Sequence, residues 1–195
     1  MAGRPSNQEE RYHQVMQAMV YCVARYGLDG ATLDRIAKQA NLSRPLIRHH
    51  LGNKEDMLGK LKSYVLDTFT ERADSMFGSL PDTQRSQALL DTLFSDENSA
   101  SSDLVMAFAA LTARAAEDSI LQQECRDWIL GFEDKILAVL AADHADTDLQ
   151  ILRMVATGIT AIFFNVSSLS ALSLPDSWHQ KSQQAAQTLL RAIGE

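Results

Sequence analysis

The segment TLDRIAKQANLSRPLIRHHLGNK, residues 32–54, carries the most specific structural pattern in this chain. Within it, LDRIAKQA spaces its apolar residues like one face of a helix, and Thr32 is a good N-cap because its hydroxyl accepts a free backbone N–H. Asn41 follows, and asparagine is one of the few residues that tolerate the positive φ of a tight turn. The segment therefore predicts a short helix that ends in a sharp turn.

A second short helix is expected at residues 44–51. Ser43 is a suitable cap for it, and Pro45 falls in its first turn, where no backbone N–H is required. Arg44 and Arg48 are expected on its outer face. Two short helices joined by a tight turn form a helix-turn-helix, whose second helix is able to enter the major groove of DNA.

This segment resembles the DNA-binding domain of the TetR family of bacterial transcriptional regulators, and the resemblance extends over residues 9–60. The family pattern has a threonine-capped helix, then A-G-V-S, then a recognition helix ending in Y-x-H-F, then x-x-K-E-x-L. The corresponding residues here are Thr32, Ala40, Asn41, Leu42, Ser43, His50, Leu51, Lys54, Glu55 and Leu58. The resemblance implies an all-helical regulator with an N-terminal helix-turn-helix domain.

The chain departs from the family pattern at four positions. Asn41 replaces glycine in the turn, and Pro45 stands where a glycine is frequent. Arg48 stands where the family has an aromatic residue that touches the phosphate backbone, and Leu51 replaces phenylalanine. A DNA-binding helix-turn-helix is still expected despite these changes. They also leave room for a second hypothesis, a helical protein-interaction module whose DNA binding is lost or altered.

Nine residues are candidates for contact with DNA: Thr32, Ser43, Arg44, Pro45, Leu46, Arg48, His49, His50 and Lys54. Arg44 and Arg48 are the expected base readers, because a guanidinium pairs bidentately with a guanine edge, and Leu46 is expected to meet a thymine methyl group. Residues at helix starts, with His50, are expected to contact phosphates, which position a protein without specifying sequence. The alternative roles are helix capping alone and, for His50, ordinary packing.

The charge is distributed unevenly along a chain whose net charge is −7. Residues 1–62 carry ten Lys or Arg against six Asp or Glu, whereas the rest carries eight against nineteen. A basic N-terminal part and an acidic remainder are expected when only one end of a protein meets phosphate. An ordinary fluctuation of surface charge is the alternative explanation.

Helical periodicity continues along the rest of the chain, and no strand-like alternation persists. Further helices are expected at residues 9–26, 54–77, 83–94, 102–116, 120–142, 147–172 and 177–193, with a polar loop at residues 95–102. The expected fold is all-α with about nine helices. Residues 1–53 are expected to form a three-helix DNA-binding domain, and residues 54–195 a helical domain for ligand binding and dimerisation.

The last two helices are the expected dimer contact. The helix at residues 147–172 is apolar around most of its circumference, which exceeds what one core needs. Pairing both helices with their symmetry mates gives a four-helix interface with twofold symmetry. A twofold dimer is expected to bind a roughly palindromic DNA operator, with its recognition helices in major grooves about 34–36 Å apart.

The resemblance also implies an apolar or amphipathic effector that binds among the C-terminal helices and releases a repressor from its operator. The candidate lining residues are Met106, Phe108, Trp128, Phe132, Met154 and Phe163. Ordinary core packing is the alternative for each of them.

An enzyme with a helical active site is a third hypothesis, but the sequence offers no Ser/His/Asp arrangement, phosphate-binding loop or metal-ligand spacing for it. No catalytic residue, cofactor or metal site is therefore expected. His49 and His50 do not suggest zinc, because adjacent helical residues point about 100° apart.

Cys22 and Cys125 lie far apart and are expected on buried faces of helices, so no disulfide framework is expected, and a reducing cytoplasm is the expected location. The start, MAGRPSNQEER, lacks the apolar region of a signal peptide and is expected to be a polar arm, in which Arg4 is a possible DNA contact. Residues 155–174 are uncharged and long enough to span a membrane, but they include seven Ser, Thr or Asn residues, so no membrane association is expected.

Overall fold

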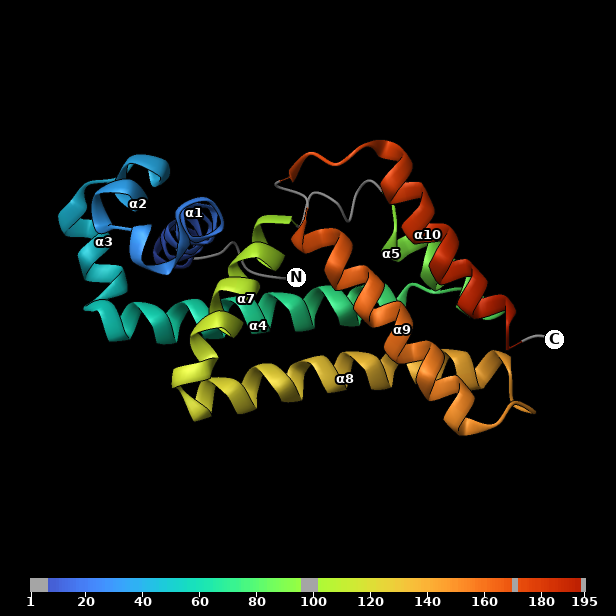
Figure 1. Ribbon diagram of the computed structural model, residues 1–195. Coiled ribbons are helices and arrows are strands. Elements are labelled where there is room, and N and C mark those ends of the chain that lie inside the picture. Colours follow the sequence, from blue (N-terminus) through green and yellow to red (C-terminus); the bar gives the residue numbers. More distant parts are fainter. Residues whose placement is uncertain (1–6, 96–101, 170–171, 194–195) are drawn as a thin grey trace. The chain divides into compact units, whose positions relative to one another are not determined.

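The computed structural model describes residues 7–95, 102–169 and 172–193, and within these ranges the chain forms nine α-helices, one 3₁₀ turn and no strand (Figure 1). The helices are α1 (Asn7–Gly30), α2 (Leu33–Ala40), α3 (Arg44–Leu51), α4 (Lys54–Gly78), α5 (Arg85–Leu93), α7 (Ser102–Arg114), α8 (Ser119–Asp143), α9 (Leu149–Ser168) and α10 (Asp176–Arg191). The all-α prediction is confirmed. Arg4 and nearly all of the expected polar loop lie outside the described residues.

The chain forms two compact units. The first comprises Met1–Thr68 and Asp103–Leu121, and the second comprises Phe69–Ser102 and Gln122–Glu195. The first unit therefore holds α1, α2, α3, nearly all of α7 and the part of α4 up to Thr68. The second holds α5, α9, α10 and most of α8. The boundary between a DNA-binding domain that ends at residue 53 and a ligand-binding and dimerisation domain that begins at residue 54 remains a prediction.

The first three helices close around a small core in the first unit. Met16 from α1, Ile36 from α2, and Ile47 and Leu51 from α3 are fully buried. Each such side chain contributes roughly 1.5–3 kcal/mol when it is withdrawn from water. This burial fixes which side of α3 faces inward, and hence which side faces solvent.

α1 breaks where the sequence predicts its end. Gly27 has φ +70° and ψ 175°, which is not a helical conformation. The helical assignment nevertheless continues to Gly30, because a short turn follows the break: the N–H of Ala31 donates to the Gly27 carbonyl at 3.1 Å. The chain then enters α2 directly.

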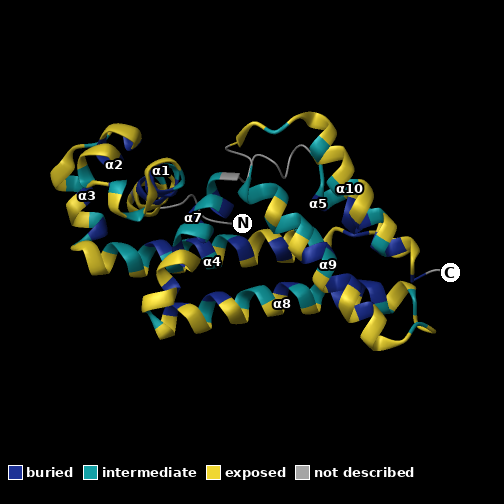
Figure 2. Cartoon of the chain, viewed as in Figure 1, coloured by how far each residue is buried: buried dark blue, intermediate teal, exposed yellow. Residues whose placement is uncertain are grey.

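The second unit has a core of its own, and Figure 2 shows buried positions along its helices. Its fully buried aliphatic residues include Leu89, Leu90, Ile136, Leu140 and Ile159. α10 packs against both α9 and α5. This arrangement holds the last two helices together within one chain.

α9 is the one helix in the described part of the chain that is long and apolar enough to cross a membrane by length and composition. The core helix of a globular protein meets the same criteria. Leu152, Ala156 and Ile159 of α9 are buried in the second core. The composition of α9 is thus explained in part by intramolecular packing.

Candidate nucleic-acid interface

The turn between α2 and α3 is built as the sequence predicts. The Thr32 hydroxyl oxygen accepts from the backbone N–H of Arg35 at 3.4 Å, so Thr32 caps α2. Asn41 is left-handed, with φ 53°, and ends α2. The N–H of Leu42 then donates back to the Ala37 carbonyl at 3.0 Å, which satisfies a free carbonyl at the end of the helix.

α3 begins after Ser43, whose backbone is extended as an N-cap requires but whose side chain makes no capping hydrogen bond. Ser43 as a whole is exposed to solvent. Pro45 occupies the first turn, as expected. The cap of α3 is thus weaker than that of α2.

The outer side of α3 carries the predicted DNA contacts. Arg44, Pro45, Arg48 and His49 are exposed, while Leu46 and His50 are half-buried. Thr32, at the start of α2, is also exposed. A short helix that buries two aliphatic residues and exposes two arginines has the form of a recognition helix.

Arg44 is paired within the protein. Its Nε lies 3.3 Å from Oδ1 of Asp34 in the first turn of α2. Both side chains are largely exposed. Sequence reasoning missed this pair, although Asp34 is the only acidic residue between positions 30 and 54.

The start of α4 is doubly capped. Asn53 Oδ1 accepts from the N–H groups of Glu55 and Asp56 at 2.8 and 2.9 Å, and Asp56 Oδ2 accepts from the N–H of Asn53 at 3.0 Å. This is a reciprocal capping box. Gly52, just before it, has φ +78°, and a Cβ there would lie 2.4 Å from Asp56 Oδ2. The box therefore requires glycine at position 52.

Lys54, a predicted phosphate contact, donates from Nζ to Asp29 Oδ1 at 2.7 Å. The hydrogen bond and the charge of Lys54 lower the pKa of Asp29 below its usual value. A lysine in the first turn opposes the helix dipole, and Asp29 offsets that cost when no phosphate is present. Lys54 remains highly exposed.

His50 lies at the end of α3, and its carbonyl accepts from Lys60 Nζ at 2.7 Å. Burial lowers the pKa of its imidazole, and the nearby His49 and Lys60 lower it further. These effects favour the neutral imidazole over the cationic form. Within the described residues, no group of three or more His, Cys, Asp or Glu side chains gathers as metal ligands.

Two side chains that sequence reasoning overlooked brace the helix-turn-helix. Gln14 of α1 donates from Nε2 to the carbonyl of Ala40, at the end of α2, at 2.7 Å. Arg35 of α2 donates to the Gly30 carbonyl at 2.7 Å, and its guanidinium lies 4.4 Å from the centre of the Tyr26 ring. Both contacts join residues of α1 to α2, but only the Gln14–Ala40 pair joins residues far apart in sequence.

Three of the six predicted effector contacts gather in the second unit. The Trp128 and Phe132 rings stack with centroids 5.5 Å apart, and the Phe132 and Phe163 rings stack at 5.9 Å. Trp128 donates from Nε1 to the Thr70 hydroxyl at 3.1 Å. A cavity of about 210 Å³ lies beside Trp128 and Phe132, with Gly131 on its wall.

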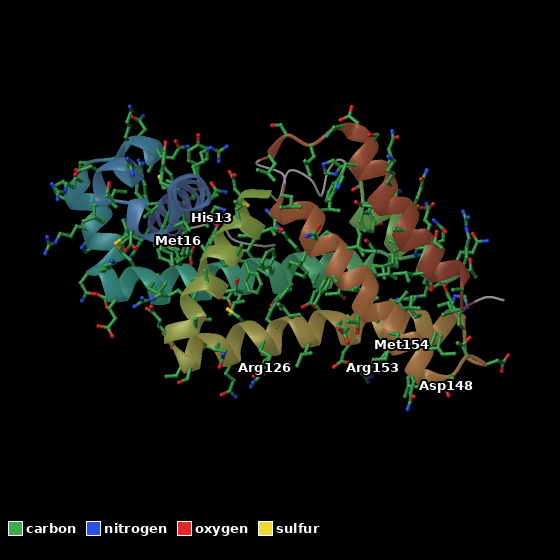
Figure 3. The ribbon with its side chains drawn as sticks, viewed as in Figure 1. His13, Met16, Arg126, Asp148, Arg153 and Met154 are labelled. Carbon is green, nitrogen blue, oxygen red and sulfur yellow. The ribbon has the colours of Figure 1, made fainter. Side chains whose placement is uncertain are left out.

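The other three predicted contacts lie elsewhere. Met106 is half-buried and Phe108 buried on α7, in the first unit. Met154, on α9, is 67% exposed (Figure 3). The first unit also contains a larger hollow of about 490 Å³, which Met19 and Leu58 help to line.

Comparison with known proteins agrees with this geometry. Residues 17–61 match the family described as "Bacterial regulatory proteins, tetR family". The chain is 30% identical to the HTH-type transcriptional repressor AcnR of Corynebacterium jeikeium over 42% of its own length, but this match spans only 44% of AcnR. It is 25% identical to the HTH-type transcriptional regulator BetI of Vibrio vulnificus, over 84% of this chain and 82% of BetI.

The fold is shared with solved structures. A TetR transcription regulator from Haloarcula marismortui superposes with a TM-score of 0.70 at 17% identity, over 94% of this chain and 97% of the regulator. The helix-turn-helix segment thus matches the tetR family of bacterial regulatory proteins, the similar proteins are HTH-type transcriptional regulators, and nearly the whole chain shares its fold with a solved TetR regulator.

Proposed function

We propose that the chain is a dimeric transcriptional repressor that binds a palindromic DNA operator and is released by a small effector. One observation carries the DNA-binding part: α3 is anchored by the fully buried Ile47 and Leu51, and its opposite side exposes Arg44, Arg48 and His49. An exposed guanidinium on a rigid helix can pair bidentately with the O6 and N7 atoms of guanine. The basic charge of residues 1–62 supports the same partner.

Phosphate contacts complete the proposed interface. Thr32, Ser43 and Lys54 are exposed at helix starts, where backbone N–H groups and the helix dipole favour an anion. Lys54 would exchange Asp29 for a phosphate when DNA binds. Such contacts hold α3 in the groove without selecting a sequence.

Dimerisation through α9 and α10 is supported by apolar side chains that the single chain leaves exposed. Leu149, Ile151 and Met154 of α9 are 58%, 41% and 67% exposed. α9 and α10 pack together within the chain, where Gly158 lies close to Leu189. A twofold contact of these two helices with a second copy would cover the exposed residues and give an isologous interface.

The proposed effector site is the aromatic cluster of Trp128, Phe132 and Phe163. Stacked rings with one polar partner suit an apolar or amphipathic molecule. The adjoining cavity of about 210 Å³ is below the roughly 300–1,000 Å³ of most ligand sites, so the effector is small or the rings rearrange around it. Release follows if the effector favours a dimer in which the recognition helices no longer match the groove spacing.

We propose that the chain carries out no enzymatic step and that it binds its operator in the cytoplasm. The rival hypotheses, a helical interaction module and a helical enzyme, predict no sequence-selective DNA binding. Sequence-selective operator binding therefore separates the proposed function from both rivals.

Replacing Arg44 and Arg48 by alanine, singly, tests the DNA-binding part. Each change should weaken binding to a selected operator by about 1–3 kcal/mol, measured by fluorescence anisotropy. Arg126→Ala is a matched control, because Arg126 is an exposed arginine of α8 in the second unit (Figure 3). If both recognition-helix variants bind like the Arg126 control, neither arginine reads the operator and the proposal fails.

A further inference from the structure

One acidic side chain stands within the otherwise cationic helix-turn-helix. Asp34 is the only Asp or Glu between positions 30 and 54, and its Oδ1 lies 3.3 Å from Nε of Arg44. Asp34 belongs to the first turn of α2, and Arg44 is the first residue of α3. The ion pair therefore spans the turn, on the exposed side of the unit.

Stability alone gives a weak reason for this pair. The side chains are 68% and 62% exposed, and ion pairs this exposed contribute little to folding because water and salt screen them. An acid in a first helical turn is favoured by the helix dipole, but Thr32 already caps α2. A carboxylate beside a surface that meets phosphates also weakens non-specific attraction to DNA.

The contact has a geometric consequence for Arg44. A guanidinium carries its donors in a planar fork, with Nε on one side and two terminal nitrogens at the end. A carboxylate beside Nε restricts the rotation of the side chain and leaves the terminal nitrogens free. Those nitrogens are the ones that pair with guanine O6 and N7.

We infer that Asp34 is a positioning residue that orients Arg44 for a bidentate contact with one guanine in each operator half-site. The inference rests on the proposed function, in which α3 enters the major groove. Arg48 provides an internal comparison, because within the described part of the chain no ion pair of Arg48 is found. The base that Arg48 reads should therefore not depend on Asp34.

The test is selection of duplexes from a randomised pool by the full-length protein, followed by sequencing. Wild-type protein should enrich a half-site with a guanine whose preference disappears in Arg44→Ala. In Asp34→Asn, that preference should fall about fivefold or more, while affinity for random duplex stays equal or rises because a negative charge is removed. Asp34→Glu, which keeps a carboxylate, should retain part of the preference.

Asp29→Asn is the matched control, because it removes the same charge from the acid that pairs with Lys54. It should leave the guanine preference intact, even if overall affinity changes. Thermal melting of each variant separates a loss of folding from a loss of base selection.

The outcomes are distinguishable. If Asp34→Asn keeps the wild-type preference at the position lost in Arg44→Ala, or if Arg44→Ala changes no guanine position, the inference is overturned while the proposed function stands. If wild-type protein enriches no sequence, the proposed function fails and the inference falls with it.

Discussion

Single residues at the ends of the short helices fix the geometry of the proposed DNA-binding surface. Asn41 and Gly52 both have positive φ, the first at the end of α2 and the second at the end of α3. Asparagine is tolerated at position 41 because its φ and ψ are those of a left-handed turn. Gly52 has ψ −143°, a conformation that is open essentially to glycine alone.

Gly52→Ala should therefore lower the free energy of unfolding by about 1–3 kcal/mol. Alanine is strained at this positive φ, and its Cβ would clash with the side chain of Asp56. Chemical denaturation monitored by circular dichroism measures this loss. Gly59→Ala is the control: Gly59 lies within α4 with open space around its Cα, so alanine should be neutral or stabilising there. Equal stability of the two variants would contradict the role given to Gly52.

His50 should make stability depend on pH below neutrality. Its pKa is lowered in the folded protein, so between the ordinary value of about 6.5 and the lower folded value the unfolded chain binds more protons. Stability is therefore lost as pH falls through that window, and no effect is expected above it. His50→Gln should show a shallower loss than wild type between about pH 7.5 and 5 in denaturant titrations. Parallel losses in both proteins would show that His50 does not titrate in this way.

At the scale of elements, α3 depends on burial rather than on intrinsic helix stability. Eight residues are too few for a stable isolated helix, so contacts with α1 and α2 must hold it. Ile47, at its centre, is fully buried. The anchor and the reading surface therefore lie on opposite sides of one short helix.

Ile47→Ala should cost about 2–5 kcal/mol of unfolding free energy, because it leaves a cavity between α1, α2 and α3. Operator affinity should fall with it, since the orientation of α3 is lost. Leu46→Ala, on the half-buried outer side, should cost much less stability, and urea denaturation compares the two. A larger loss for Leu46→Ala would mean that the assigned inner and outer sides of α3 are reversed.

The sequence predicts these elements well where local rules decide. Helical periodicity located every described helix to within four residues, and the roles of Thr32 and Asn41 were predicted correctly from capping and turn preferences. The pairs between Arg44 and Asp34, and between Lys54 and Asp29, were not anticipated. They join residues 10 and 25 positions apart, so only the packing of helices determines them.

The effector residues show the same limit. Residue type alone predicts six large apolar side chains as effector contacts, and the fold brings three of them together, Trp128, Phe132 and Phe163. Met106 and Met154 are the same residue type, yet Met106 is half-buried on α7 and Met154 is exposed on α9. Residue type therefore indicates which side chains can line a pocket, but the tertiary packing decides which of them do.

For the whole molecule, the contrast between a basic N-terminal part and an acidic remainder predicts salt-dependent DNA binding. Each neutralised phosphate contributes about −0.9 to the slope of log affinity against log salt concentration. Lys54→Ala should make this slope shallower by about one, because one phosphate contact is removed. Anisotropy titrations between about 50 and 200 mM salt measure it, with Arg126→Ala as the control whose slope stays that of wild type. An unchanged slope in Lys54→Ala would remove Lys54 from the interface.

We expect two copies of the helix-turn-helix to be held by α9 and α10 at the spacing of one DNA turn. The most direct test of this arrangement is to sequence the genomic fragments that the purified full-length protein selects, and to determine the mass of the complex on the enriched site. We predict an inverted repeat with half-site centres about 34–36 Å apart, bound by two chains. An unpaired site bound by one chain, or no enriched sequence at all, would contradict it.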